Sequence, residues 1–190
     1  MELKDLIKRN IGADGKLLEA LARVSRIQTY RKNEMILRQG GTIENINILI
    51  DGLLAGYSYS KEGKTVVDCF CFREGDIAIP PHDISMPSGL NIKAVEESIM
   101  VLMPRKDVLR IMEEFKEARD IYDHKLMSAL EDHNKVKYAL QRYSGKELYN
   151  WFVKAYPSLI EKVPHKYIAS FLGMSDVHFS RIVNEKVSIT

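Results

Sequence analysis

The amino-acid sequence predicts an α+β protein in which an N-terminal antiparallel β-roll is followed by a long helix and a small helical domain. The first observation is that turn-forming residues are concentrated. Seven of the eleven glycines lie between positions 40 and 89, and three of the six prolines lie between positions 80 and 87. After that region only Gly145 and Gly173 remain, so a turn-rich β region is followed by helices. The other two observations are a heptad repeat in the middle of the chain and a paired-helix motif near its end.

Size and composition indicate a folded, soluble protein. At 190 residues the chain fits one domain with a smaller one appended, and its 45% hydrophobic and 28% charged residues exclude a disordered chain. No apolar run approaches the ~18 residues of a membrane span, and the first residues, Met1–Asp5, carry no apolar signal segment. Cys69 and Cys71 are too few and too close together for a disulfide framework. We therefore expect a cytoplasmic protein with no membrane partner.

Short strands separated by turns fill the first half of the chain. Helical apolar spacing over residues 3–24 predicts one or two short helices, and from Tyr30 onward the pattern changes to strands. A glycine-containing turn at Lys61–Lys64 predicts a hairpin. The predicted strands are residues 35–37, 46–50, 53–59, 65–72, 92–94 and 99–103. Six or seven short strands at this spacing describe a small antiparallel barrel or roll.

Two helices follow the predicted strands. Pro104 suits the first position of a helix that runs to Phe115. Beyond it, a heptad stripe alternates spacings of four and three: Tyr122, Leu126, Ala129, His133, Val136, Leu140 and Tyr143. Its charged flanks and the length of the helix favour a seam between two copies of the chain, and the alternative is a stripe that packs on its own domain. We expect a β-roll domain at 1–115, a dimerisation helix at 116–143 and a small helical domain at 144–190.

Residues 163–183 have the pattern of a helix-turn-helix. Ala169 is small where two helices would cross, Gly173 suits the left-handed end of the first helix, and Ser175 is a good N-cap for the second. The apolar residues expected to hold the two helices together are Ile168, Leu172, Val177 and Ile182. The second helix would enter the major groove of DNA. The alternative is a plain helical hairpin with a glycine corner.

Side chains at the start of the second helix are candidates for DNA contact, because in a helix-turn-helix they face the base edges. Asp176 would accept a hydrogen bond from cytosine or stabilise the N-terminus of the helix. His165 and Lys166, at the start of the first helix, are candidates for phosphate contacts. The predicted DNA-binding residues are Lys166, Ser175, Asp176, His178 and Arg181.

Several segments resemble the Crp/Fnr family of bacterial transcription regulators. In the predicted roll, Ile36–Gly40, Ile48–Gly52 and Gly75–Ala78 resemble the family's early strand, its strand end and its ligand-binding opening. Near the C-terminus, Lys166–Gly173 and Phe179–Ile182 are similar to the helix-turn-helix of shorter, non-classical members. The order of β-roll, long helix and helix-turn-helix is also that of the family over nearly the whole chain.

The resemblance implies a function for each part. The β-roll would be a double-stranded β-helix of the cyclic-nucleotide-binding kind that senses a small effector. The long helix would join two chains, and the helix-turn-helix would bind a two-fold symmetric operator. Arg181 matches the family's recognition arginine, which implies contact with guanine O6 and N7. The expected partners are double-stranded DNA, a second copy of the chain, an unidentified effector and RNA polymerase, and the protein is expected to be a regulator rather than an enzyme.

The effector region departs from the family's cyclic AMP site. The resemblance places the effector-binding residues at Gly75, Asp76, Ile77, Ala78, Ser88 and Gly89. Members that bind cyclic AMP have a glutamate for the ribose and an Arg–Ser pair for the cyclic phosphate, whereas this chain has Asp76 and Ser88–Gly89. A buried phosphate without a guanidinium loses its charge-assisted partner. No cofactor is therefore certain and cyclic AMP is disfavoured; the pocket holds another ligand or none. Ser88, Gly89 and backbone N–H groups between Asp76 and Leu90 could form a small anion nest.

Two other functions stay open. The chain ends at Thr190, where classical members continue into a winged hairpin, and this favours a ligand-sensing or interaction module with a degenerate helix-turn-helix that no longer binds DNA. A β-barrel enzyme of the cupin type would need several metal-binding histidines, but the predicted β region has only His82. We predict no catalytic and no metal-binding residue.

Overall fold

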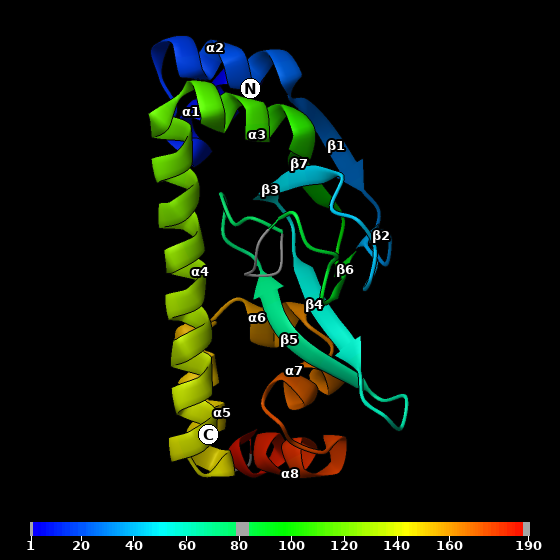
Figure 1. The fold of residues 1–190 in the computed structure, drawn as a ribbon. Helices are drawn as coiled ribbons and strands as arrows, with labels where there is room; N and C mark the ends of the chain where they lie inside the picture. The colour runs from blue at the N-terminus through cyan, green and yellow to red at the C-terminus, as the bar shows by residue number, and fades with distance from the viewer. Residues whose placement is uncertain (1, 79–83, 188–190) are drawn as a thin grey trace. The chain divides into compact units, whose positions relative to one another are not determined.

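The computed structural model describes residues 2–78 and 84–187, which form helices and short strands (Figure 1). The helices are α1 (Leu3–Ile11), α2 (Gly15–Val24), α3 (Arg105–Glu114), α4 (Lys116–Arg142), α5 (Gly145–Ala155), α6 (Leu159–Lys162), α7 (His165–Phe171) and α8 (Asp176–Val187). The strands are β1 (Arg26–Tyr30), β2 (Met35–Leu37), β3 (Asn45–Asp51), β4 (Leu54–Tyr59), β5 (Thr65–Cys71), β6 (Asn91–Ala94) and β7 (Ser98–Pro104). This order of elements confirms the predicted α+β fold class.

The strands form two sheets. One contains β1, β7 and β3 in that order, and the other contains β2, β6, β4 and β5. The pairs β1–β7, β3–β7 and β2–β6 are antiparallel, as expected for a roll. The β3–β7 and β2–β6 pairs each contain a register shift, and such bulges bend strands locally.

Strand β7 separates two hydrophobic clusters, because successive side chains of a strand point to opposite faces. Val101 and Met103 join a cluster with buried side chains of α1, α2 and α3, here called the helix-side cluster. The opposite cluster, here called the roll interior, consists of Leu49, Leu54, Ala78, Ile92, Ala94, Met100 and Leu102. The apolar run in the sequence therefore belongs to a strand that is buried on both faces.

The chain falls into two compact units. One consists of residues 1–56 and 70–130, and the other of residues 57–69 and 131–190. Helix α4 contributes residues to both units and lies within one residue of the predicted helix at 116–143. The predicted division into three functional domains stays a prediction.

Strand β1 and Pro104 differ from the expectation. The sequence predicts strands only from Tyr30, because the first four side chains of β1 are exposed and give no apolar alternation. Backbone pairing with β7, from Arg26 opposite Leu102 onward, places β1 in its sheet. Pro104 ends β7 instead of beginning α3, because its ψ of 127° is extended.

Aromatic side chains form the core of the unit that contains α5, α7 and α8. The buried Phe152 ring stacks on Tyr156 with centroids 5.1 Å apart and lies edge-on to Phe171 at 5.9 Å. The Tyr149 ring of α5 lies edge-on to Phe179 of α8 at 5.8 Å. Because aromatic pairs favour specific geometries, these contacts fix how α8 is rotated about its own axis.

Candidate nucleic-acid interface and effector region

Helices α7 and α8 are joined by a short turn and are here called the α7–α8 pair. Gly173 in the turn has a φ of 65°, the left-handed region that favours glycine. The Met174 N–H donates to the Ala169 carbonyl over 2.9 Å and so closes the end of α7. Ser175 Oγ accepts a hydrogen bond from the His178 N–H over 3.2 Å and caps α8, as the sequence predicts. Glycine and serine thus determine where one helix ends and the next begins.

Buried apolar side chains hold the α7–α8 pair together, but they are not quite the predicted ones. Ile168 of α7 and Ile182 of α8 are buried as expected. The prediction for Val177 is wrong, because this side chain is 82% exposed. Residues of an α-helix follow one another at about 100°, so Val177 lies about 200° around the helix from Phe179. Phe179, which is fully buried, fills the inward position instead.

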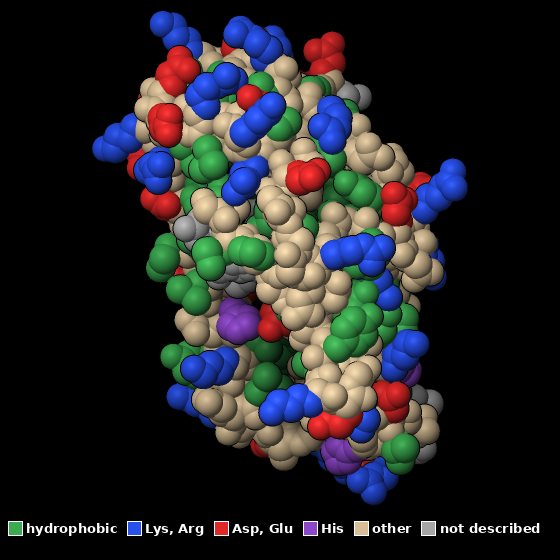
Figure 2. Space-filling view, turned by 45° about the vertical axis from the view of Figure 1, so that its right-hand side comes forward, with side chains coloured by type: hydrophobic (Ala, Val, Ile, Leu, Met, Phe, Trp, Pro, Cys, Tyr) green, Lys and Arg blue, Asp and Glu red, His purple; other side chains and the backbone are tan. Residues whose placement is uncertain are grey.

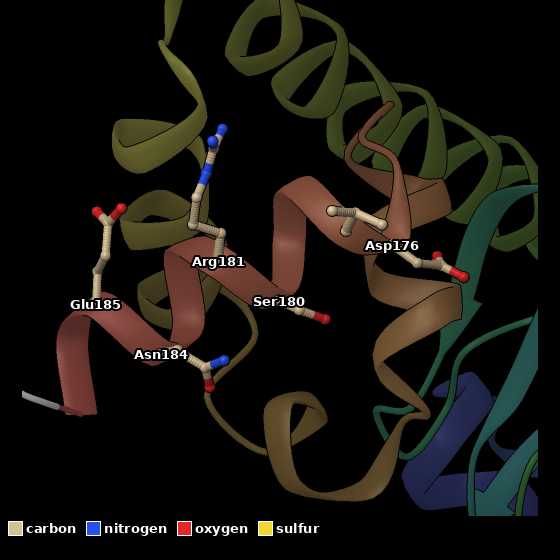
Figure 3. A pocket seen from close by; sticks show the side chains of 6 residues that line it. Asp176, Ser180, Arg181, Asn184 and Glu185 are labelled. Atoms are coloured by element: carbon tan, nitrogen blue, oxygen red, sulfur yellow. The ribbon is translucent and has the colours of Figure 1, made fainter.

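An open groove of about 660 Å³ follows one side of α8 (Figure 3). The residues that line it, here called the α8 face, are Asp176, Val177, Ser180, Arg181, Asn184 and Glu185. They come in adjacent pairs four residues apart and therefore share one side of the helix. In Figure 3, Arg181 and Glu185 project along one edge of this face and Ser180 and Asn184 along the other. Because all lining residues belong to one helix, the groove does not enclose a small molecule in the way that a ligand pocket does.

The predicted DNA-binding residues divide between the α8 face and its surroundings. Asp176 and Arg181 lie on the α8 face and are exposed. Ser175 caps α8, and Lys166 lies exposed at the start of α7 with its ammonium 5.6 Å from the centroid of the Tyr167 ring. Sequence reasoning missed four residues of the face that the four-residue spacing from Asp176 and from Arg181 could have revealed: Val177, Ser180, Asn184 and Glu185.

His178 and Glu185 connect α8 to the start of α5. The imidazole of His178 packs so closely that a Cβ on Gly145 would lie 2.6 Å from its Nε2. Glu185 pairs with Lys146 Nζ at 2.6 Å, and this hydrogen bond and the lysine charge lower the pKa of Glu185. His178 Nδ1 lies 3.0 Å from Nη2 of Arg181. His178 is therefore partly buried beside the α8 face and orients the guanidinium of Arg181.

The α8 face is not a basic surface. It carries two acidic residues, Asp176 and Glu185, and one basic residue, Arg181. On the face of the molecule that Figure 2 shows, lysine and arginine side chains are interspersed with acidic ones. This distribution agrees with the net charge of +2 for the whole chain. Contacts with phosphate would therefore depend on individual residues such as Lys166 rather than on a strong basic field.

The turn after β5 carries part of the predicted effector site and points its residues in different directions. The Asp76 carboxylate accepts the N–H groups of Phe72 and Arg73 at 2.9 and 3.0 Å. Ile77 packs against the helix-side cluster, whereas Ala78 is fully buried in the roll interior. Asp76 thus stabilises its own turn, and of these residues Ala78 faces the roll interior.

Two helices hold the same turn. Lys125 of α4 donates a hydrogen bond from Nζ to the Gly75 carbonyl over 2.8 Å, and burial lowers the pKa of Lys125. Asn10 of α1 donates to the Glu74 carboxylate over 3.1 Å, and Arg9 pairs with the same carboxylate. Gly75 has a φ of 88°, and a Cβ there would lie 3.3 Å from both Lys125 Nζ and Asn10 Oδ1. Glycine at this position therefore lets α1 and α4 approach the turn closely.

The other predicted effector residues are Ser88 and Gly89. Ser88 is 2% exposed and its hydroxyl donates to the Leu90 carbonyl over 2.6 Å. The same hydroxyl accepts the Leu90 N–H, and the Ser88 N–H donates to the Gly41 carbonyl. Two of the donors of the expected anion nest are thus used within the chain, while Gly89 is exposed. The effector-binding role of this segment stays a prediction.

The predicted dimer seam follows α4 and is largely uncovered. Of its residues, Ala129, His133 and Leu140 are exposed, and Tyr122, Leu126 and Val136 are half-buried. Further exposed apolar side chains on the same helix are Met127, Leu130 and Tyr138. Tyr122 also packs against the helix-side cluster, so the N-terminal end of the seam serves its own unit as well. The seam itself stays a prediction.

Residues 2–78 and 84–187 offer no cluster of metal ligands and no membrane-spanning helix. This part of the chain contains no group of three or more His, Cys, Asp or Glu side chains that could hold a metal ion. His82 lies outside the described residues. Cys69 and Cys71 are half-buried and form no disulfide. No described helix combines the length and apolar character needed to cross a membrane.

Comparisons with known proteins agree with this architecture. Residues 27–115 match the family model described as "Cyclic nucleotide-binding domain". FixK2 from Bradyrhizobium japonicum has a similar structure, with a TM-score of 0.74 and 16% identity over 87% of this chain and 85% of that one. A protein from Eubacterium rectale that is described as a Crp/Fnr-family regulator has a TM-score of 0.74 and 15% identity over 92% of this chain and 83% of that one.

A third similar structure is the c-di-GMP-responsive global regulator CLP from Xanthomonas campestris, with a TM-score of 0.69 and 11% identity over 92% of each chain. No curated protein matches the sequence significantly. Residues 27–115 are thus similar to a cyclic nucleotide-binding domain, and the chain has a fold similar to that of a Crp/Fnr-family regulator. These matches confirm the resemblance to the Crp/Fnr family that the sequence indicates.

No buried side chain of the described residues supplies the positive charge that a buried cyclic phosphate needs. The buried polar side chains among them are Asn10, Asn47, Ser88, Asn91 and Ser98, and none carries a charge. Asn47 Oδ1 has no hydrogen-bond partner in the described part of the chain. This oxygen can accept a hydrogen bond, whereas a phosphate needs donors and positive charge. No step of the function is therefore assigned to a cyclic nucleotide.

Proposed function

We propose that the protein is a homodimeric, cytoplasmic transcription regulator that binds a two-fold symmetric operator through α8 and responds to an effector sensed by its β-roll. The observation that carries the proposal is the α8 face. A capped helix exposes one continuous side, while buried aromatic residues hold its other side in place. Two proteins of similar fold support it, since one is described as a transcriptional regulator of the Crp/Fnr family and the other as a global regulator. RNA polymerase is an expected further partner.

In this proposal the α7–α8 pair acts as a helix-turn-helix. Arg181 would donate to guanine O6 and N7, and its contact with His178 supplies part of the required orientation. Lys166, exposed at the start of α7, would contact a phosphate. Asp176 would accept from cytosine or act on the dipole of α8, and Ser175 would hold the end of the helix that enters the groove.

The exposed apolar side chains of α4 support the homodimer. Met127 is 55% exposed and Leu130 is 43% exposed on a helix that carries a heptad stripe. A second copy of α4 would cover such residues, as in a coiled coil. Two copies would then present two α8 helices to half-sites one helical turn apart, about 10 bp.

The effector would be a ligand other than cyclic AMP. The roll interior is apolar, and the described residues place no charged side chain among its buried groups. The turn that contains Gly75 is hydrogen-bonded to Asn10 of α1 and to Lys125 of α4. These hydrogen bonds support a route by which a conformational change in the roll could reach the long helix. Cyclic AMP should therefore give no heat of binding in a calorimetric titration.

The direct experiment is selection of binding sites from a pool of random duplexes, followed by a gel-shift assay on the enriched duplex. Enrichment of a symmetric sequence supports the proposal. The second candidate is an interaction module that no longer binds DNA, and the two acidic residues of the α8 face favour it. It predicts no enriched sequence and no shift at low ionic strength, where phosphate contacts are strongest.

A further inference from the structure

We propose that Val177 is a specificity-determining residue that recognises thymine by contact with its 5-methyl group. This inference rests on the proposed function and deepens it. The starting observation is that Val177 is 82% exposed, although a valine gains stability by burial. Valine also has a lower helix propensity than alanine and many polar residues. Neither the packing nor the formation of α8 therefore accounts for a valine at this position.

The position of Val177 is suited to reading a base. It is the second residue of α8, and in a helix-turn-helix the N-terminal residues of the second helix contact base edges. It lines the groove of the α8 face and lies four residues before Arg181, hence on the same side of the helix. Phe179, rather than Val177, supplies the contact with the core. The valine is thus presented outward by a helix whose rotation is fixed.

The chemistry of the major groove indicates what Val177 would contact. The thymine methyl is the apolar group among the edges of the four bases there, and the other features are hydrogen-bond donors and acceptors. The isopropyl group of valine has no hydrogen-bonding atom, so guanine, cytosine and adenine edges would each leave a polar atom without a partner. A thymine methyl instead removes apolar surface of both groups from water.

The neighbouring residues limit the alternatives. Asp176 and Ser180 offer acceptors and a donor on the same face, so polar recognition is available without Val177. Asp176 also repels phosphate, which argues against a position of Val177 over the DNA backbone. The side chain therefore fits a base edge better than the sugar–phosphate chain.

The test uses the full-length protein and the duplex enriched from a pool of about 30 random base pairs. Each thymine of this duplex is replaced in turn by deoxyuridine, which lacks only the methyl group. The variant is Val177→Ala, and the matched control is Val66→Ala, at a valine of β5 that is 43% exposed. Val177→Ala should unfold as the wild type does, because the side chain makes no core contact.

We expect at least one thymine at which deoxyuridine weakens wild-type binding about fourfold, the effect of losing one buried methyl group. The same loss should persist in Val66→Ala and become smaller in Val177→Ala, which keeps only one methyl group at this position. If Val177→Ala keeps the full loss at every thymine, the inference is overturned while DNA binding stands. If no duplex is enriched, the proposed function fails as well, so the two failures are distinguishable.

Discussion

The rotation of α8 about its axis decides which residues face a partner, and Phe179→Ala tests it. Phe179 is fully buried and packs edge-on against two rings, Tyr149 at 5.8 Å and His165 at 5.5 Å. Truncation removes a whole ring from a packed core, and such substitutions cost about 3–5 kcal/mol. Val177→Ala is the matched control, and at an exposed position the expected change is within about 0.5 kcal/mol.

The assay is urea unfolding followed by the fluorescence of Trp151, the single tryptophan of the chain. Trp151 lies 5.7 Å from Tyr156 in the same aromatic core, so it reports on the unit that contains α8. The expected result is a midpoint that falls strongly for Phe179→Ala and stays in place for Val177→Ala. Equal destabilisation by the two variants, or a larger effect of Val177→Ala, would refute the orientation of α8 and with it the α8 face.

Further predictions concern DNA contact, ligand choice, backbone geometry and pH. Arg181→Ala should cost about 1–3 kcal/mol at one base position and relax specificity there, measured by gel shift over operator variants; a uniform loss over all variants would contradict base reading. Calorimetry should show no binding of cyclic AMP, and a micromolar Kd, about −8 kcal/mol, would show that a partner for the phosphate had been overlooked. Gly52 has a φ of 108°, and a Cβ there would lie 2.6 Å from Ser98 Cα, whereas Gly63 has a φ of 76° and open space. Gly52→Ala should therefore cost about 1–3 kcal/mol more in urea unfolding than Gly63→Ala, and equal costs would contradict the close approach. Lys146 lowers the pKa of Glu185, so their pair stabilises the fold above the ordinary glutamate pKa of 4.5 and loses this effect as pH falls through the lowered pKa. The stability difference between wild type and Lys146→Met should accordingly shrink below about pH 4.5, and a difference that is constant over the acid range would contradict the pair.

Regular features of the fold could be predicted from sequence where local patterns and packing agree. Strand β7 is indicated by its continuous apolar run and helix α4 by its heptad repeat, and Gly173 and Ser175 mark the turn between α7 and α8 by backbone chemistry. Strand β1 could not be predicted in this way, because its exposed side chains carry no alternation and its backbone partner lies about 70 residues away in the chain.

The candidate site was harder to predict because it depends on a rotation and on particular hydrogen bonds. The apolar pattern alone predicts that Val177 faces the core. In the structure Phe179 occupies the core position instead, because its larger ring packs against the neighbouring aromatic rings. Asp76 lies in the expected turn, yet the N–H groups of Phe72 and Arg73 occupy its carboxylate. Such contacts are set by tertiary structure, and residue type alone does not reveal them.

The most direct test of the central claim is the stoichiometry and symmetry of DNA binding. Analytical ultracentrifugation of the full-length protein with the enriched duplex would count the chains on each duplex, and hydroxyl-radical footprinting would map the protected sugars. We expect two chains per duplex and protection related by a two-fold axis, with half-sites centred about 10 bp apart. One chain on an asymmetric site, or no protected sequence at all, would contradict this expectation.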